Sequence, residues 1–178
     1  MTHIISKFTH WLRKEDDGNS TIEFALFFPM FIVLFISAFE AGLLSIRGIL
    51  IERALDIAVR DLRLGTWTPP THTALRQRVC DNAIGIPQCM DTLLLEMQPV
   101  STESWDLLSN NAQCVDRSQT VLPATTFDGG HENNIMLVRA CAVFSPIFPQ
   151  IGLGYHIQKD STGGYAVIAS SAFVNEPR

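Results

Sequence analysis

One apolar run near the N-terminus constrains this chain more than any other feature. No charged residue occurs from Phe24 to Phe39, and if Glu40 is tolerated the run continues to Ile46. A helix over residues 24–46, rising ~1.5 Å per residue, would be about 34 Å long, which is enough to cross a bilayer. A helix in the core of a soluble protein is rarely apolar on all sides. The run therefore predicts a membrane-spanning helix.

A cleaved secretory signal is the first alternative for this run. Such signals have an apolar stretch of ~7–15 residues, followed by a small-residue cleavage motif of the Ala-x-Ala type. Here the stretch is longer, and Glu40-Ala41-Gly42 takes the place of that motif. The segment before the run, residues 14–18, is mixed in charge. We therefore expect the helix to be retained in the mature protein.

The orientation of this helix is indicated by the cysteines. Basic residues flank both ends of the run, so the positive-inside rule does not decide the topology. They are Lys7, Arg13 and Lys14 before the run, and Arg47, Arg53, Arg60 and Arg63 after it. All four cysteines follow the run, and an even number on one side is typical of an oxidising compartment. The C-terminal part is therefore expected in the periplasm.

The four cysteines are expected to form two disulfides. A metal site is the weaker interpretation, because there is no Cys-x-x-Cys pair and no histidine lies next to a cysteine at ligand spacing. Four cysteines allow three pairings. We favour Cys80–Cys89, a short loop that Gly85 could help to turn, together with Cys114–Cys141, which would attach a long loop to a strand.

The pattern beyond the run predicts an α+β fold. Apolar residues continue at helical spacing to Leu62, and Gly65 is a plausible stop, so one helix should cover about residues 20–64. Thr71 can cap a second helix that ends near Ala83. Three aliphatic runs bounded by turn residues predict strands at Leu93–Val100, Ile135–Phe144 and Tyr165–Val174.

This organisation divides the chain into three parts. Residues 1–18 form a polar leader or cytoplasmic tail, residues 19–46 the transmembrane helix, and residues 47–178 an exported domain. In that domain the long helix would pack on a small antiparallel sheet.

The motif that indicates function lies where the leader meets the helix. Gly18 ends the charged tail, and Glu23 follows five residues later, just inside the apolar run. A charged side chain costs ~2.5–3.5 kcal/mol at mid-membrane on insertion scales, and less near an interface. Glu23 therefore either marks the membrane surface or has a partner that offsets this cost.

The segment Gly18-x4-Glu23-Phe24-Ala25-Leu26, with Pro29 early in the apolar run, resembles type IV prepilins. With Phe39-Glu40-Ala41-Gly42 and residues 52–60 (ERALDIAVR), it is similar to TadE-like minor pseudopilins of the tight-adherence (Flp) pilus system. The resemblance covers residues 18–65 and leaves the TadE, TadF and TadG types open.

This resemblance implies cleavage by a prepilin peptidase between Gly18 and Asn19. Glu23 would then be the fifth mature residue and would pair with the terminal amine of a neighbouring subunit. The implied partners are other pilin and pseudopilin subunits, the prepilin peptidase and the inner-membrane assembly platform. The implied role is to initiate, cap or assemble a pilus used in cell adhesion, from the inner membrane or within the pilus itself.

Other functions receive little support from the sequence. Lys and Arg form no basic cluster of the kind that binds nucleic acid, and no arrangement of residues predicts catalysis, so we expect neither nucleic-acid binding nor enzymatic activity. His131-Glu132 beside Asp128 is better explained as a polar loop than as a metal site, and no cofactor is expected. Glu40 is interpreted as the end of the membrane segment. A type II secretion pseudopilin and an uncleaved, membrane-anchored periplasmic sensor or binding domain remain the alternatives.

Overall fold

The computed structural model describes residues 20–64, 71–101, 112–119, 123 and 125–176. The elements along the chain are α2 (Ser20–Arg63), α3 (His72–Asn82), α4 (Cys89–Thr92), β1 (Leu93–Val100), β2 (Ile135–Phe144), α5 (Leu153–His156) and β3 (Tyr165–Val174). A long N-terminal helix and a three-stranded antiparallel sheet make up the fold, which confirms the α+β prediction. The two short helices α4 and α5 were not predicted.

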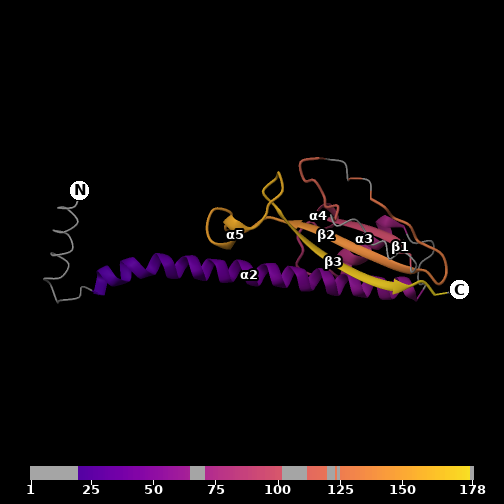
Figure 1. The fold of residues 1–178 in the computed structure, drawn as a ribbon, viewed down its shortest axis with the longest axis horizontal. Helices are drawn as coiled ribbons and strands as arrows, with labels where there is room; N and C mark the ends of the chain where they lie inside the picture. The colour runs from indigo at the N-terminus through magenta and orange to yellow at the C-terminus, as the bar shows by residue number, and fades with distance from the viewer. Residues whose placement is uncertain (1–19, 65–70, 102–111, 120–122, 124, 177–178) are drawn as a thin grey trace.

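Helix α2 dominates the shape of the molecule. Its 44 residues span about 66 Å at 1.5 Å per residue, and Pro29 lies within it without ending it. The first turns of the helix extend beyond the other described elements, whereas its C-terminal half lies against the sheet (Figure 1). The helix passes position 46 without a break, so the predicted boundary between membrane segment and exported domain falls inside one continuous element.

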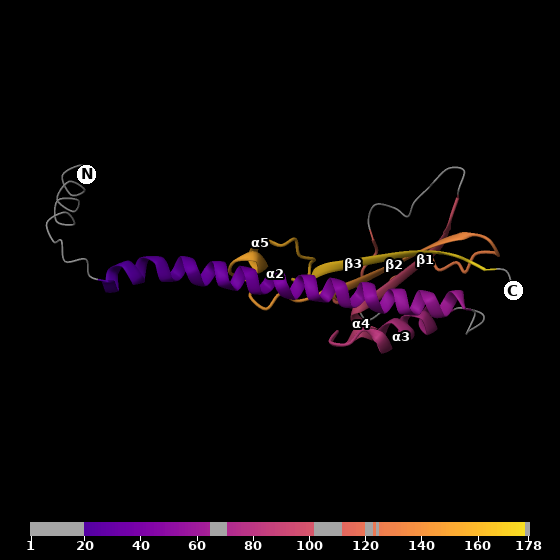
Figure 2. The same cartoon turned by 90° about the horizontal axis from the view of Figure 1, so that it is seen from below.

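The core forms around the C-terminal half of α2. Ala54 and Ala58 lie on one helix face and have no exposed surface, so their small side chains allow the neighbouring elements to approach closely. Strand β3 contacts α2 on one side, and α3 packs on the other (Figure 2). The other buried residues of this half are Ile51, Leu55, Val59 and Leu62.

The sheet has the order β1-β2-β3, and both pairs are antiparallel. Ile135 pairs with both Val100 and Val174, so all three strands are in register at this end. Along β3, buried and exposed side chains alternate over most of the strand, with Tyr165, Val167, Ala169 and Phe173 in the core. This alternation is the pattern of a strand that buries one face against the helices.

Helix α3 begins as its sequence predicted. The Thr71 hydroxyl accepts a hydrogen bond from the Ala74 amide at 3.2 Å, which satisfies one of the free N–H groups of the first turn. Leu75 and Val79, one turn apart, are both buried. Helix α3 therefore attaches to α2 through a narrow apolar face.

The connection between β2 and β3 runs back along α2. It carries α5, which lies beside the middle of α2, away from the sheet (Figure 1). Residues 145–157, the first part of this connection, contact the part of α2 that the sequence assigns to the membrane.

Candidate membrane and assembly helix

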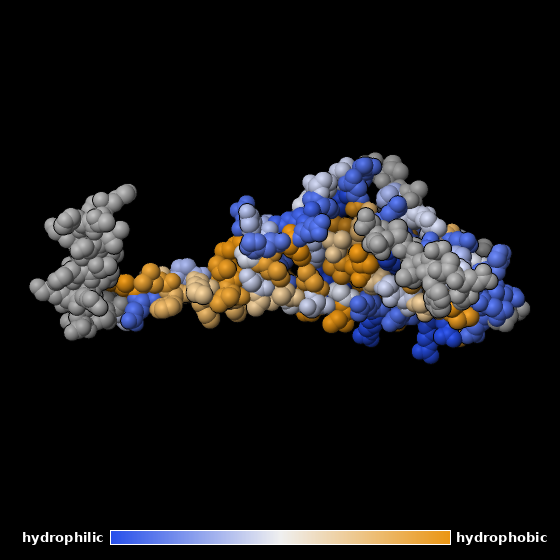
Figure 3. Space-filling model, in the orientation of Figure 1, coloured by the Kyte–Doolittle hydropathy of each residue, from blue (hydrophilic) through white to orange (hydrophobic). Residues whose placement is uncertain are grey.

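The N-terminal half of α2 exposes apolar side chains on all sides. Among the described residues, α2 is the one helix long and apolar enough to cross a membrane, and none of its most apolar window is buried. The apolar surface is visible along this part of the molecule (Figure 3). The large exposed side chains are Ile22, Phe24, Leu26, Phe27, Phe28, Met30, Phe31, Val33, Leu34, Phe35 and Phe39. An apolar surface of this extent indicates burial in lipid or against other helices.

Glu23 lies in the first turn of this helix and is exposed. A carboxylate in the first turn interacts favourably with the free N–H groups and the positive end of the helix dipole. Its side chain is also open to a partner at the end of the apolar segment. Gly18 and Asn19, the predicted cleavage site, lie outside the described residues, so the position of the cut stays a prediction.

Glu40 has a structural role that the sequence analysis did not predict. The residue is only 1% exposed, although it belongs to the apolar helix. Both of its carboxylate oxygens accept hydrogen bonds from the Ile147 amide at 3.2 Å, and one also accepts from the Phe148 amide at 3.3 Å. Glu40 therefore attaches the β2–β3 connection to α2 instead of simply marking the end of the membrane segment.

Ser37 lies one turn before Glu40 and extends this contact. Its hydroxyl accepts from the Leu153 amide at 3.2 Å and donates to the Val33 carbonyl at 2.7 Å. Gly152 makes the close approach possible, because a Cβ there would lie 2.5 Å from the Ser37 hydroxyl and its φ of 62° favours glycine. The connection thus rests directly on the backbone of α2.

Arg47 fixes the start of the same connection. Its guanidinium lies 4.8 Å from the centre of the Phe144 ring and 5.8 Å from that of Tyr165, and it donates to the Tyr165 hydroxyl and to the Ser145 carbonyl. Glu40 and Arg47 are seven residues apart, which places them on one helix face about 10 Å from each other. Together they set the orientation of the sheet relative to the N-terminal half of α2.

Both disulfides form with the pairing that the sequence favoured. Cys80–Cys89 joins α3 to α4, and Cys114–Cys141 joins the segment 112–119 to the middle of β2. Each bond closes a loop and so restricts the unfolded chain, which stabilises the domain by ~2–4 kcal/mol in typical cases.

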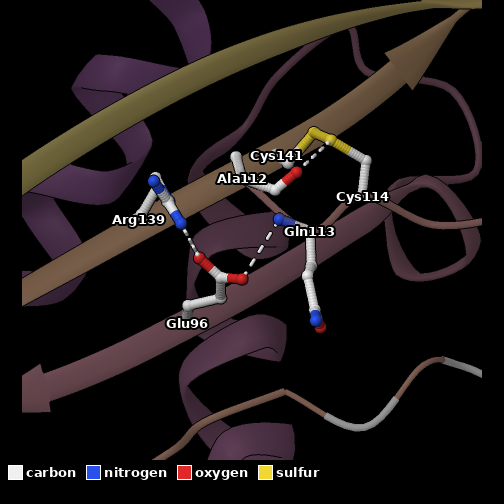
Figure 4. The surroundings of a disulfide bond; sticks show 6 residues. All are labelled: Glu96, Ala112, Gln113, Cys114, Arg139 and Cys141. Carbon is white, nitrogen blue, oxygen red and sulfur yellow. Dashed lines mark hydrogen bonds and ion pairs between the residues drawn. A yellow bond between two sulfur atoms is a disulfide. The ribbon is translucent and has the colours of Figure 1, made fainter. Parts of the chain in front are cut away.

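A buried ion pair supports the second disulfide. Glu96 on β1 lies opposite Arg139 on β2, and the Arg139 Nη2 is 2.6 Å from a Glu96 carboxylate oxygen. The other Glu96 oxygen accepts from the Gln113 amide at 3.1 Å, next to Cys114 (Figure 4). The segment before β2 is therefore held on the sheet by a covalent bond and by a charged network.

The polar turns of the domain are occupied by structural contacts. Asp128 accepts a hydrogen bond from the Gly130 amide, as expected for a polar loop. Burial tends to raise the pKa of Asp160, but hydrogen bonds from Thr162 and from the Gly164 amide outweigh it and hold the pKa below its usual value. The Asp160 carboxylate thus organises the turn that leads into β3. Within the described residues, no group of three or more potential ligands could hold a metal ion.

Comparison with known proteins connects this chain to one family. Residues 18–60 match the family model of TadE-like proteins. The matched range begins at Gly18, includes Glu23 and the apolar segment, and ends in the part of α2 that packs on the sheet. No curated protein and no solved structure matches the chain significantly.

Proposed function

We propose that this chain with a TadE-like N-terminal segment is a minor pseudopilin of the tight-adherence pilus system. The match over residues 18–60 carries the proposal, because it coincides with an exposed apolar helix that has Glu23 in its first turn. A prepilin peptidase removes residues 1–18, α2 anchors the protein in the inner membrane, and the disulfide-bonded domain lies in the periplasm. The protein helps to initiate, cap or assemble the pilus, and this function is structural instead of catalytic.

The chemistry of Glu23 gives this proposal a mechanism. A carboxylate near the end of an apolar helix is costly in lipid, and an ammonium group from a neighbouring subunit would offset that cost. Cleavage after Gly18 would create such an ammonium group at Asn19 of each subunit. Pairing Glu23 with it favours one register between adjacent helices, while the exposed apolar surface of α2 supplies the contact area.

Two other functions differ from this one in observable ways. A type II secretion pseudopilin would share the cleavage and the membrane helix, and the neighbouring genes would distinguish it from a pilus component. A membrane-anchored periplasmic sensor would never be cleaved. Cleavage removes 18 of 178 residues from a 19.8 kDa chain, a decrease of about 2 kDa that coexpression with the peptidase would reveal.

The first prediction concerns processing. Replacing Gly18 with phenylalanine should make the full-length form accumulate, because the peptidase of the resembled family cuts after a glycine. The measurement is the mass and N-terminal residue of protein recovered from its native membrane, with Asn19 first in the wild type. The leader carries three basic and three acidic residues, so the formal charge stays at −5 after the cut.

Gly42 provides the matched control for this experiment. A Cβ at Gly42 would meet nothing within 4 Å, so Gly42→Phe should be processed like the wild type. A native N-terminus at Met1 or Thr2, in cells that contain the peptidase, would remove the main support for the pseudopilin assignment.

The second prediction concerns Glu23. Glu23→Ala should leave membrane anchoring and both disulfides intact, while crosslinking to partner pilins and pilus output fall at least about tenfold, equivalent to ~1.4 kcal/mol of association energy. Glu23→Gln should behave more like Ala than like the native residue if the ion pair matters. Glu52→Ala, which changes an exposed glutamate in the C-terminal half of the same helix, is the control. Wild-type assembly by both Glu23 variants would reduce Glu23 to a marker of the membrane surface.

A further inference from the structure

The connection between β2 and β3 reaches a level of α2 that lies below the expected membrane surface. A hydrocarbon core of ~30 Å that begins at Phe24 would end about 20 residues later, near Leu44. Ser37 and Glu40, which bind the connection, would then lie about 10 Å and 6 Å inside that end. A loop that contacts these residues cannot stay entirely in water.

The composition of this connection suits such a position. No Asp, Glu, Lys or Arg occurs from Phe144 through Gln158. Ile147 is 50% exposed and Tyr155 61% exposed, so the loop presents apolar surface outward beside that of α2. The first charged residue after the loop is Lys159, whose ammonium donates to the Pro149 carbonyl at 2.9 Å and lies 5.8 Å from the centre of the Tyr155 ring. Tyrosine and lysine are common at the level of lipid headgroups.

Part of the backbone of the connection is also prepared for an environment with little water. Irregular backbone is excluded from lipid unless its N–H groups have partners. Two of the 13 residues of the loop are prolines and have no N–H, and five of the other eleven amides donate hydrogen bonds within the protein. Pro146 and Pro149 are the prolines; Ile147 and Phe148 donate to Glu40, Leu153 to Ser37, Tyr155 to the Gly152 carbonyl and Ile157 to the Leu153 carbonyl.

We propose that residues 145–157 enter the outer leaflet of the inner membrane beside α2, where Ile147 and Ile151 contact lipid acyl chains and Tyr155 lies near the headgroups. The proposal rests on the proposed membrane span of α2. Its depth of about 10 Å matches that of segments that lie in the membrane interface. Glu40 and Ser37 are polar residues of an apolar helix because they bind the amides of this loop. The domain is thus held at the membrane by two elements, which restricts its tilt.

Depth-dependent fluorescence quenching tests this proposal on the full chain. Trp11, Trp67 and Trp105 are replaced by phenylalanine, and one tryptophan is introduced by Tyr155→Trp, Leu34→Trp or Ile84→Trp. Each variant is reconstituted in phosphatidylethanolamine–phosphatidylglycerol vesicles that contain phospholipids brominated either near the headgroup or deep in the acyl chain. Non-reducing mass spectrometry checks that both disulfides are present.

The three positions distinguish the loop from the helix and from the domain. Leu34 is exposed in the middle of the apolar segment, so Leu34→Trp should be quenched most by the deep bromines. Ile84 is 80% exposed, and its neighbour Gly85 lies at the level of Leu50, about 9 Å beyond Leu44, so Ile84→Trp should not be quenched. Tyr155→Trp should lose at least about half of its emission to the shallow bromines and less to the deep ones.

Three results would overturn the proposal, and they differ in what they imply for α2. If Leu34→Trp is quenched but Tyr155→Trp behaves like Ile84→Trp, the helix spans the membrane and the loop does not enter it. If the Tyr155→Trp emission changes with protein concentration and not with bromine, the loop surface contacts a second copy of the chain, and the proposed lipid contact is wrong. If Leu34→Trp is also unquenched, both the membrane span and the loop insertion are wrong.

Discussion

Replacing Arg139 with methionine should lower the free energy of unfolding by ~3–5 kcal/mol, the cost of leaving one partner of a buried ion pair alone. Glu96 is buried on the sheet, and the guanidinium of Arg139 binds its carboxylate at 2.6–2.8 Å. Methionine retains much of the apolar volume of the side chain but supplies no donor. The Gln113 amide would still donate to the Glu96 carboxylate, but one neutral amide offsets the desolvation of that charge poorly.

The measurement is urea unfolding of the full chain in detergent with both disulfides intact. The double variant Glu96→Met with Arg139→Met should recover most of the lost stability, because it leaves no buried charge behind. Arg63→Met is the control, since its ion pair with Glu176 has both side chains more than half exposed and should contribute no more than ~1 kcal/mol. If Arg139→Met lowers the free energy of unfolding as little as Arg63→Met does, water must reach the Glu96 carboxylate.

Most of the regular structure could be predicted from local patterns. The strand bounds Leu93–Val100, Ile135–Phe144 and Tyr165–Val174 agree with the structure because each aliphatic run is flanked by turn residues or breaks in its pattern. The end of α2 at Arg63 follows from the apolar stripe that stops at Leu62. These features depend on neighbours within a few residues, and a single sequence contains that information.

The disulfide pairing was predictable for a related reason. Cys80 and Cys89 are nine residues apart and are separated by Gly85 and Pro87, so a short turn can bring them together. Once this pair is chosen, Cys114 has only Cys141 left. The two four-residue helices α4 and α5, by contrast, are too short to produce a periodic pattern.

The long-range contacts of Glu40 and Glu96 could not be predicted. Glu40 and Ile147 are separated by 107 positions, and no periodicity relates them. The proximity of Glu96 and Arg139 depends on the register of β1 and β2, which a pattern of aliphatic residues does not define for charged ones. Glu40 in an apolar helix and Glu96 in an apolar strand were nevertheless visible as exceptions. Such exceptions indicate that a partner exists, without indicating where it lies in the sequence.

Replacing Glu40 has two opposing effects on the stability of the contact between α2 and the connection 145–157. Glu40→Ala removes a buried charge, which by itself would be favourable. It also leaves the Ile147 and Phe148 amides without their acceptor, at ~1–3 kcal/mol for each buried group. Two amides together outweigh the relief, so we expect the connection 145–157 to detach from α2 with a net loss of ~2 kcal/mol or more. Glu40→Gln keeps one acceptor oxygen and should lose less.

Hydrogen exchange of the membrane-reconstituted full chain measures this balance locally. A loss of ~2 kcal/mol corresponds to a roughly 30-fold faster opening, so peptides from residues 145–157 should exchange about that much faster in Glu40→Ala. Peptides from β3 should stay protected, because the core residues of that strand pack against α2 independently of Glu40. Glu52→Ala controls for the loss of any glutamate from α2, and it should leave both regions unchanged. Slower exchange of residues 145–157 in Glu40→Ala would contradict this expectation. It would mean that burying the carboxylate costs more free energy than its hydrogen bonds contribute, so that Glu40 destabilises the contact between the connection and α2.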